Sequence, residues 1–114
     1  MRRFCPSALV ALALVGLAAC ARPLAPGALL AGVTSAQADD WDAAVRHWSE
    51  AVRHNPGSAA AHNNLGVAYE KRGDWDAARR EYEEALRLDP GNLLIKENFE
   101  AFKVRLEAGR GRTP

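Results

Sequence analysis

The feature that most constrains this chain is an internal repeat. Residues 40–58 align with residues 74–92 at an offset of 34 residues, and eleven of the aligned pairs are identical, from Asp40 with Asp74 to Gly57 with Gly91. A fixed period of this length indicates similar helix-containing units that stack on their neighbours and bury a shared core. We therefore interpret residues 41–55 as the second helix of an earlier repeat, equivalent to the helix that begins at Trp75.

One complete unit occupies residues 59–92, with the sequence AAAHNNLGVAYEKRGDWDAARREYEEALRLDPGN. Small residues stand where two helices of the unit would cross, so that their backbones can approach each other: Gly66, Ala78 and Ala85. Larger side chains stand beside them and fill the remaining space: Leu65, Tyr69 and Tyr82. This arrangement predicts two packed helices.

The residues between and after these helices carry signals for helix ends. Gly73 follows two basic residues and tolerates a left-handed conformation, and Asp74 is placed to cap the next helix. Pro90 and Gly91 end the second helix, and Asn92 is placed as the cap of a third.

The spacing of these residues resembles the tetratricopeptide repeat family, whose units are 34 residues long. Within residues 59–92, the matching positions are the seventh, eighth, eleventh, twentieth, twenty-fourth, twenty-seventh and thirty-second: Leu65, Gly66, Tyr69, Ala78, Tyr82, Ala85 and Pro90. The resemblance implies an all-α fold, a short solenoid of antiparallel helix hairpins. We expect the domain to span residues 39–107.

Both flanks of the repeat extend this prediction. Residues 93–107 carry apolar side chains at helical spacing, which predicts a C-terminal capping helix that covers the last repeat: Leu94 or Ile95, Phe99, Phe102 and Leu106. Residues 108–114 are expected to form a flexible tail. Residues 20–38 are either a tether or a degenerate first helix, in which Gly32 matches Gly66 but Leu29, Leu30 and Val33 would face the groove.

The chain begins like an exported protein. Arg2 and Arg3 precede an apolar run over residues 7–17, which fits a signal peptide and is too short for a comfortable membrane-spanning helix. The run ends in Leu17-Ala18-Ala19-Cys20, which resembles the lipid-attachment motif of bacterial lipoproteins. This resemblance implies a signal peptide over residues 1–19, lipidation of Cys20, and a membrane-anchored lipoprotein on the periplasmic side.

A second cleavage site competes with the first. Ala36-Gln37-Ala38 before two acidic residues has the small-x-small form that ordinary signal peptidase cleaves. Its use would make residues 1–38 the signal and leave a soluble periplasmic or secreted protein. An uncleaved anchor is a third alternative, and all three export the chain. Either cleavage leaves no disulfide within the mature domain, because Cys5 and Cys20 are the chain's two cysteines.

Composition and motifs argue against several function classes. Beyond the first 38 residues the chain carries 12 basic and 14 acidic side chains, a net charge of −2, with no basic block that would indicate nucleic-acid binding. The three histidines have no thiol or carboxylate cluster at metal-ligand spacing: His47, His54 and His62. We therefore expect no catalysis, no cofactor, no metal and no nucleic-acid partner, and membrane contact only through the signal or a lipid anchor.

The predicted function is binding of another envelope or secreted protein in the concave groove. The resemblance places these contacts on the first helix of the complete repeat: Asn63, Asn64, Val67, Glu70 and Lys71. It also implies that the Asn64 amide can hydrogen-bond the backbone of a bound peptide. Leu94 and Asn98 stand where relatives that clamp a C-terminal carboxylate carry basic residues, so we expect no such clamp. The alternative is a structural subunit that self-associates and has no groove ligand.

Overall fold

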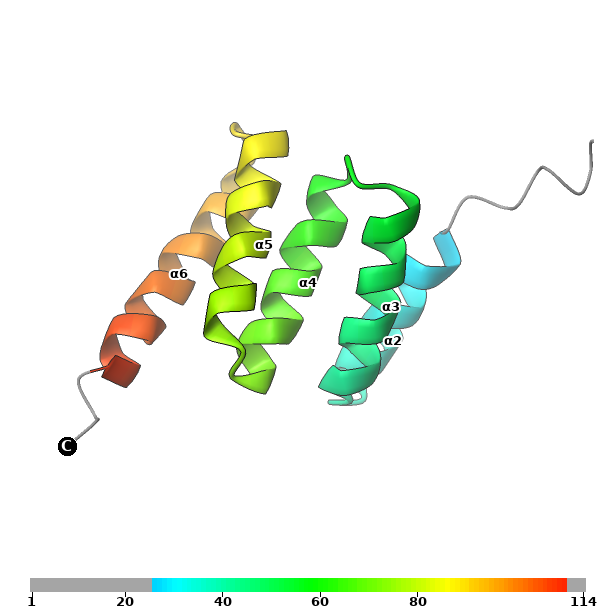
Figure 1. Ribbon diagram of the computed structural model, residues 1–114, viewed down its shortest axis with the longest axis horizontal. Coiled ribbons are helices and arrows are strands. Elements are labelled where there is room, and N and C mark those ends of the chain that lie inside the picture. The colour runs from blue at the N-terminus through cyan, green and yellow to red at the C-terminus, as the bar shows by residue number, and fades with distance from the viewer. Residues whose placement is uncertain (1–25, 111–114) are drawn as a thin grey trace, which may run out of the picture.

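The computed structural model describes residues 26–110, which form five α-helices and, within that range, no strand. The helices follow one another in a row, with α2 and α6 at opposite ends (Figure 1). Their bounds are α2 Pro26–Gln37, α3 Trp41–His54, α4 Ala59–Arg72, α5 Trp75–Leu88 and α6 Leu93–Arg110. The predicted all-α solenoid of antiparallel helix hairpins is confirmed.

Three of the helices begin at a side chain that accepts a backbone hydrogen bond. Asp40 accepts from the Ala43 amide at 2.9 Å, Ser58 from the Ala61 amide at 3.2 Å, and Asn92 from the Ile95 amide at 3.2 Å. Such caps satisfy amides that have no partner within the helix. The prediction that Asn92 caps the last helix is therefore confirmed.

The predicted cap at Asp74 is only half correct. Asp74 occupies the N-cap position of α5, but its side chain makes no hydrogen bond to the first turn. One of its carboxylate oxygens instead lies 3.4 Å from Nε of Arg72. The carboxylate has thus turned toward a nearby cation and away from the helix amides.

This difference between two equivalent aspartates predicts different costs of substitution. Asp40→Ala should lower the free energy of unfolding by about 1 kcal/mol, because it removes a cap hydrogen bond. Asp74→Ala should cost clearly less, since it removes only an exposed ion pair. Urea unfolding of the two variants, followed by circular dichroism, measures both values, and equal losses would contradict the assignment.

The turn between α4 and α5 confirms the predicted role of Gly73. Its φ angle is +81°, in the left-handed region that favours glycine, and its amide bonds the Glu70 carbonyl at 3.0 Å. The Asp74 amide bonds the Tyr69 carbonyl at 2.9 Å. These bonds close α4 and send the chain back along it as α5.

The first hydrophobic core lies where α2, α3 and α4 meet. The core is formed by Ala44, Val45, Trp48, Leu65 and Ala68. Leu29 and Val33 of α2 pack against this core, and the indole Nε1 of Trp48 donates to the Leu29 carbonyl at 3.0 Å. A Cβ at Gly32 would collide with the Trp48 ring, so the two helices touch at a residue without a side chain.

These contacts correct the expected placement of the α2 side chains. Leu29 and Val33 are packed against the core, whereas the sequence pattern placed them in the groove; Leu30 alone of the three is strongly exposed. The reason is the bulk of Trp48, which stands where the later repeat has Tyr82 and needs apolar cover from α2. Residues 26–37 therefore form a packed helix.

The second core lies between α4, α5 and α6 and is largely aromatic. Ala78, Tyr82 and Phe102 form it, and the ring centroids of Tyr82 and Phe102 are 5.3 Å apart. The Tyr82 ring also lies against Gly66, where an added Cβ would come within 3.2 Å of the ring. The predicted close crossing at Gly66 is thus confirmed.

The last helix covers this core, as the apolar spacing predicted. Of the two candidates at its start, Ile95 is buried and Leu94 is exposed. The helix also continues to Arg110, three residues beyond the predicted end at 107. The predicted tail over residues 108–114 is therefore wrong for residues 108–110, which complete the final helical turn; residues 111–114 lie outside the described range.

Candidate functional site

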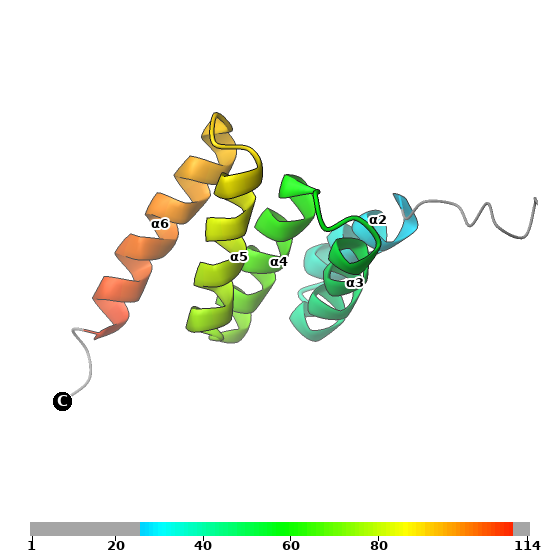
Figure 2. The ribbon, with the colours of Figure 1, turned by 45° about the horizontal axis from the view of Figure 1, so that its top comes forward.

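A pocket opens between α4 and α6, and α4 is the helix that carries the predicted contacts. Its volume is about 390 Å³, and the lining residues are Val67, Glu70, Lys71, Tyr82, Asn98 and Arg105. Helices α4 and α6 contact each other directly, although α5 separates them in the chain. Figure 2 shows the row of helices from a second direction, with α6 at one end. Three of the five predicted contacts, Val67, Glu70 and Lys71, thus line one pocket.

The carboxylate of Glu70 is buried and bonded through both of its oxygens. Oε2 accepts from the Tyr82 hydroxyl at 3.0 Å, and Oε1 accepts from Nε of Arg105. The side chain of Glu70 is only 8% exposed, whereas that of Arg105 is about half exposed. Glu70 therefore joins α4 to both α5 and α6 and is not free to bind a ligand.

These contacts also shift proton affinities. Burial, followed by the Glu70 charge and its hydrogen bond, raises the pKa of Tyr82 well above the ordinary tyrosine value. The hydrogen bond to Glu70 raises the pKa of Arg105 as well, so the guanidinium stays charged. The pocket keeps a neutral phenol, a carboxylate and a cation in one connected network.

The raised pKa of Tyr82 predicts that stability falls at alkaline pH. A phenol with a higher pKa in the folded state contributes stability that is present below the unfolded value of 10.0 and is lost above it. Above about pH 10, and not below it, the wild type should lose up to about 1.4 kcal/mol per pH unit from this group. Tyr82→Phe should be less stable at neutral pH but should lack this component of the alkaline loss. Urea titrations at several pH values test this, and parallel curves for both proteins would refute it.

The two predicted asparagines lie beside the pocket and do not line it. Asn63 is buried, and its Oδ1 accepts from Nδ2 of Asn98 on α6 at 3.1 Å. Nδ2 of Asn63 points to Oδ1 of Asn64 at 3.5 Å, at the limit of a hydrogen bond. Asn63 is therefore a link between repeats, and Asn64, which is half-buried, is the amide nearer to solvent.

Lys71 is the most accessible of the predicted contacts. Its Nζ lies 5.7 Å from the centroid of the Trp41 ring, a cation–π contact with α3. Among residues 26–110, no carboxylate lies within ion-pair distance of Lys71. This ammonium group thus stands at the pocket with its charge unmatched by an acidic side chain of the described helices.

Sequence reasoning missed three residues of the pocket, Tyr82, Asn98 and Arg105, as potential contacts. Tyr82 was interpreted only as a core residue, and Asn98 only as a departure from the carboxylate clamp. A signal for Arg105 was present, because it follows Lys71 by one period of 34 residues and so occupies the same place in the next unit.

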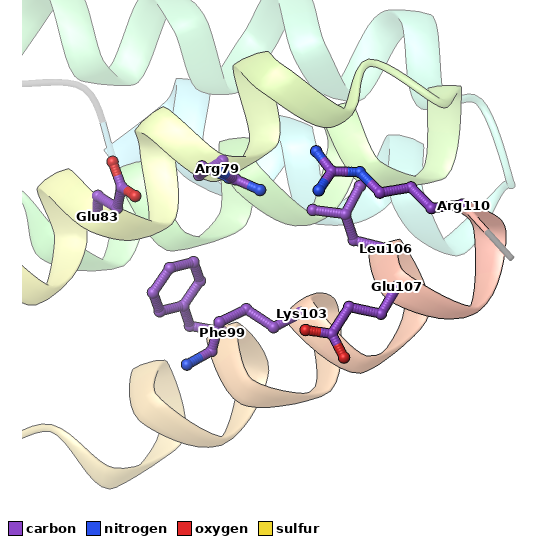
Figure 3. A pocket seen from close by; sticks show the side chains of 7 residues that line it. All are labelled: Arg79, Glu83, Phe99, Lys103, Leu106, Glu107 and Arg110. Carbon is purple, nitrogen blue, oxygen red and sulfur yellow. The ribbon is translucent and has the colours of Figure 1, made fainter.

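A second, smaller pocket of about 190 Å³ lies between α5 and α6 (Figure 3). Arg79 and Glu83 lie on α5, across from the α6 side chains that complete the lining: Phe99, Lys103, Leu106, Glu107 and Arg110. Lys103 lies 5.1 Å from the centre of the Phe99 ring and pairs with Glu100 at 2.7 Å. Both acidic and basic side chains line this pocket.

His62 has a structural role that the sequence did not reveal. It is buried, with Nδ1 at 2.6 Å from a Glu81 oxygen on α5 and Nε2 at 2.9 Å from the Pro56 carbonyl. The imidazole thus ties α4 to α5 and to the turn before α4. Within residues 26–110, no group of three or more potential ligand side chains could hold a metal ion.

The described helices do not include the predicted lipid-attachment site. Among the described helices, none has the length and apolar character needed to cross a membrane. Cys20 and the apolar run before it lie outside the described residues.

Comparison with known proteins agrees with this geometry. A domain described as the C-terminal TPR-containing domain of a Plasmodium falciparum FK506-binding protein superposes with a TM-score of 0.68 at 25% identity, over 75% of this chain. The chain spans 56% of the length of that structure. No curated protein sequence matches the chain. The profile of the tetratricopeptide repeat family matches residues 29–92, from α2 to the end of the complete repeat, and the chain therefore belongs to this family.

Proposed function

We propose that the chain is a non-catalytic binding module whose pocket between α4 and α6 receives a segment of another protein. Tetratricopeptide domains generally mediate protein–protein interactions. The observation that carries the proposal is the pocket itself, which combines an apolar side chain, Val67, with the exposed cations Lys71 and Arg105. Apolar contact with a few convergent polar groups is typical of a recognition site.

The cellular setting is part of the same proposal. Leu17-Ala18-Ala19-Cys20 at the end of an apolar run supports export and lipidation of Cys20 in a bacterial envelope. The packing of Leu29 and Val33 on the first core favours this over cleavage after Ala38, which would remove α2. The expected partner is then an envelope or secreted protein. The intact mass of the native protein distinguishes acylated Cys20 from a free Asp39.

The decisive experiment is in-cell crosslinking followed by affinity purification. The test variant carries Asn64→Ala and Val67→Glu, and the matched control carries Val104→Glu, which makes the same Val-to-Glu change at an exposed site outside the pocket. Both must keep the helical circular-dichroism spectrum. We expect the wild type and the control to capture a partner that the test variant loses by at least about tenfold. Equal capture by all three proteins would refute the groove as the binding site.

Self-association is a second candidate function, supported by a separate observation. Large apolar side chains are strongly exposed on the first and last described helices: Leu30 is 67% and Leu93 is 71% exposed. Ends of repeat arrays are usually capped by polar faces, so such residues can bury area against another copy. Sedimentation equilibrium tests this candidate, which requires that the wild type be oligomeric and that Leu93→Glu be monomeric.

A further inference from the structure

We infer that the segment bound in this pocket is acidic, with an internal Asp or Glu side chain placed between Lys71 and Arg105. This inference rests on the proposed function, because it names the chemistry of the ligand for the same pocket. Three observations support it. The single acidic lining residue is already paired within the protein, two cations line the pocket, and the residues expected to clamp a terminal carboxylate are not basic.

The first observation is that the one acidic lining residue cannot repel an acidic ligand effectively. Glu70 is nearly buried, and its two oxygens accept from Tyr82 and Arg105. An acid that is already paired and hydrogen-bonded contributes little net negative potential to the pocket. Its partner Arg105 is offset in the same way, so the lining, with two cations and one anion, has a net charge of +1. Lys71 carries this charge, since no carboxylate of the described helices lies within ion-pair distance of it.

The second observation concerns the two cations. Lys71 on α4 and Arg105 on α6 are 34 residues apart, and so occupy equivalent places in successive units. Arg105 uses Nε for Glu70, and its two terminal nitrogens make no hydrogen bond to the described residues. Because Glu70 already holds the guanidinium in place, binding of a second carboxylate by those nitrogens would cost little further side-chain entropy.

The third observation favours an internal acidic side chain of the ligand over its C-terminal carboxylate. The positions that would clamp a terminal carboxylate hold Leu94 and Asn98, and Asn98 is already bonded to Asn63. The cations line the pocket together with Val67 instead. An extended segment with an apolar side chain against Val67 and an acidic side chain near Lys71 fits this distribution of groups.

The test is a selection of binding peptides from a random, C-terminally amidated display library by the wild-type chain. We expect the enriched peptides to carry Asp or Glu next to an apolar residue. A synthesised peptide of this kind should bind Lys71→Glu at least about tenfold more weakly. It should bind Lys96→Glu within about twofold, since this matched control makes the same charge change on α6 outside the pocket. Binding should also weaken as salt increases.

The outcomes separate this inference from the proposed function. If enriched peptides lack acidic residues, or bind Lys71→Glu as well as the wild type, yet fail to bind Val67→Glu, the pocket is a binding site and the acidic class is wrong. If no enriched peptide depends on Val67 or Lys71, both the inference and the proposed groove fail. Arg105→Gln gives an independent check, and unchanged affinity in this folded variant would also overturn the inference.

Discussion

A chain that starts at Asp39 is expected to be much less stable than one that keeps α2, and to lose the helical signal of α3 first on heating. This truncation removes α2, whose Leu29, Val33 and Ala36 pack against the first core. It also removes the carbonyl that accepts the hydrogen bond of the Trp48 indole. Burial of these side chains is worth several kcal/mol at about 25 cal/mol per Å² of apolar area. Because small domains have only about 5–15 kcal/mol in total, we expect α3 to separate from the stack.

The matched control is a chain that starts at Ala25 and so keeps all five described helices. Its thermal midpoint should exceed that of the chain starting at Asp39 by at least about 10 °C. Circular dichroism and the fluorescence of Trp48, which is buried against α2, report the difference. Similar midpoints for the two chains would show that α2 adds no stability. Cleavage after Ala38 would then be compatible with a folded product.

Phe102→Ala is expected to be the most damaging single substitution in the C-terminal half. Phe102 is fully buried, and its ring contacts those of Tyr82, Trp75 and Phe99 at centroid distances of 5.3, 5.9 and 6.1 Å. Removal of a buried phenylalanine side chain typically costs about 3–5 kcal/mol. Because α6 contributes Asn98 and Arg105 to the pocket, its loosening should also abolish binding.

The control for this substitution is Val104→Ala, two residues later on the same helix. Val104 is 67% exposed, so its truncation should change the free energy of unfolding by less than about 0.5 kcal/mol. Urea unfolding of both variants measures the difference. If the two losses were equal, the buried aromatic cluster could not be what attaches α6 to the rest of the stack.

Local patterns in the sequence determined the helices and their turns. The 34-residue offset between Asp40 and Asp74 predicted two equivalent helices, and both α3 and α5 are present with equal lengths of 14 residues. Gly73 has the predicted left-handed conformation, and Asn92 makes the predicted cap. These features depend on neighbours only a few residues away, so a single sequence contains the information needed.

Residues that act across the stack could be only partly foreseen. The cap role of Asp74 depended on whether Arg72 competes for its carboxylate. The sequence predicts Asn63 as a ligand contact, but in the structure its amide oxygen accepts a hydrogen bond from Asn98 of α6. Likewise, Glu70 was a candidate contact whose two oxygens are taken up by Tyr82 and Arg105.

The sequence by itself therefore determined the fold class, the repeat and its turns, because helix periodicity, caps and glycine conformations are local properties of the chain. Only the tertiary structure decided which side chains of α2 are buried. It also decided that both carboxylate oxygens of Glu70 accept hydrogen bonds within the protein, whereas Lys71 has a cation–π contact and no acidic partner among the described residues. The physical reason is that burial and polar pairing depend on groups 12 to 35 residues away in the chain, whose approach is set by the packing of whole helices.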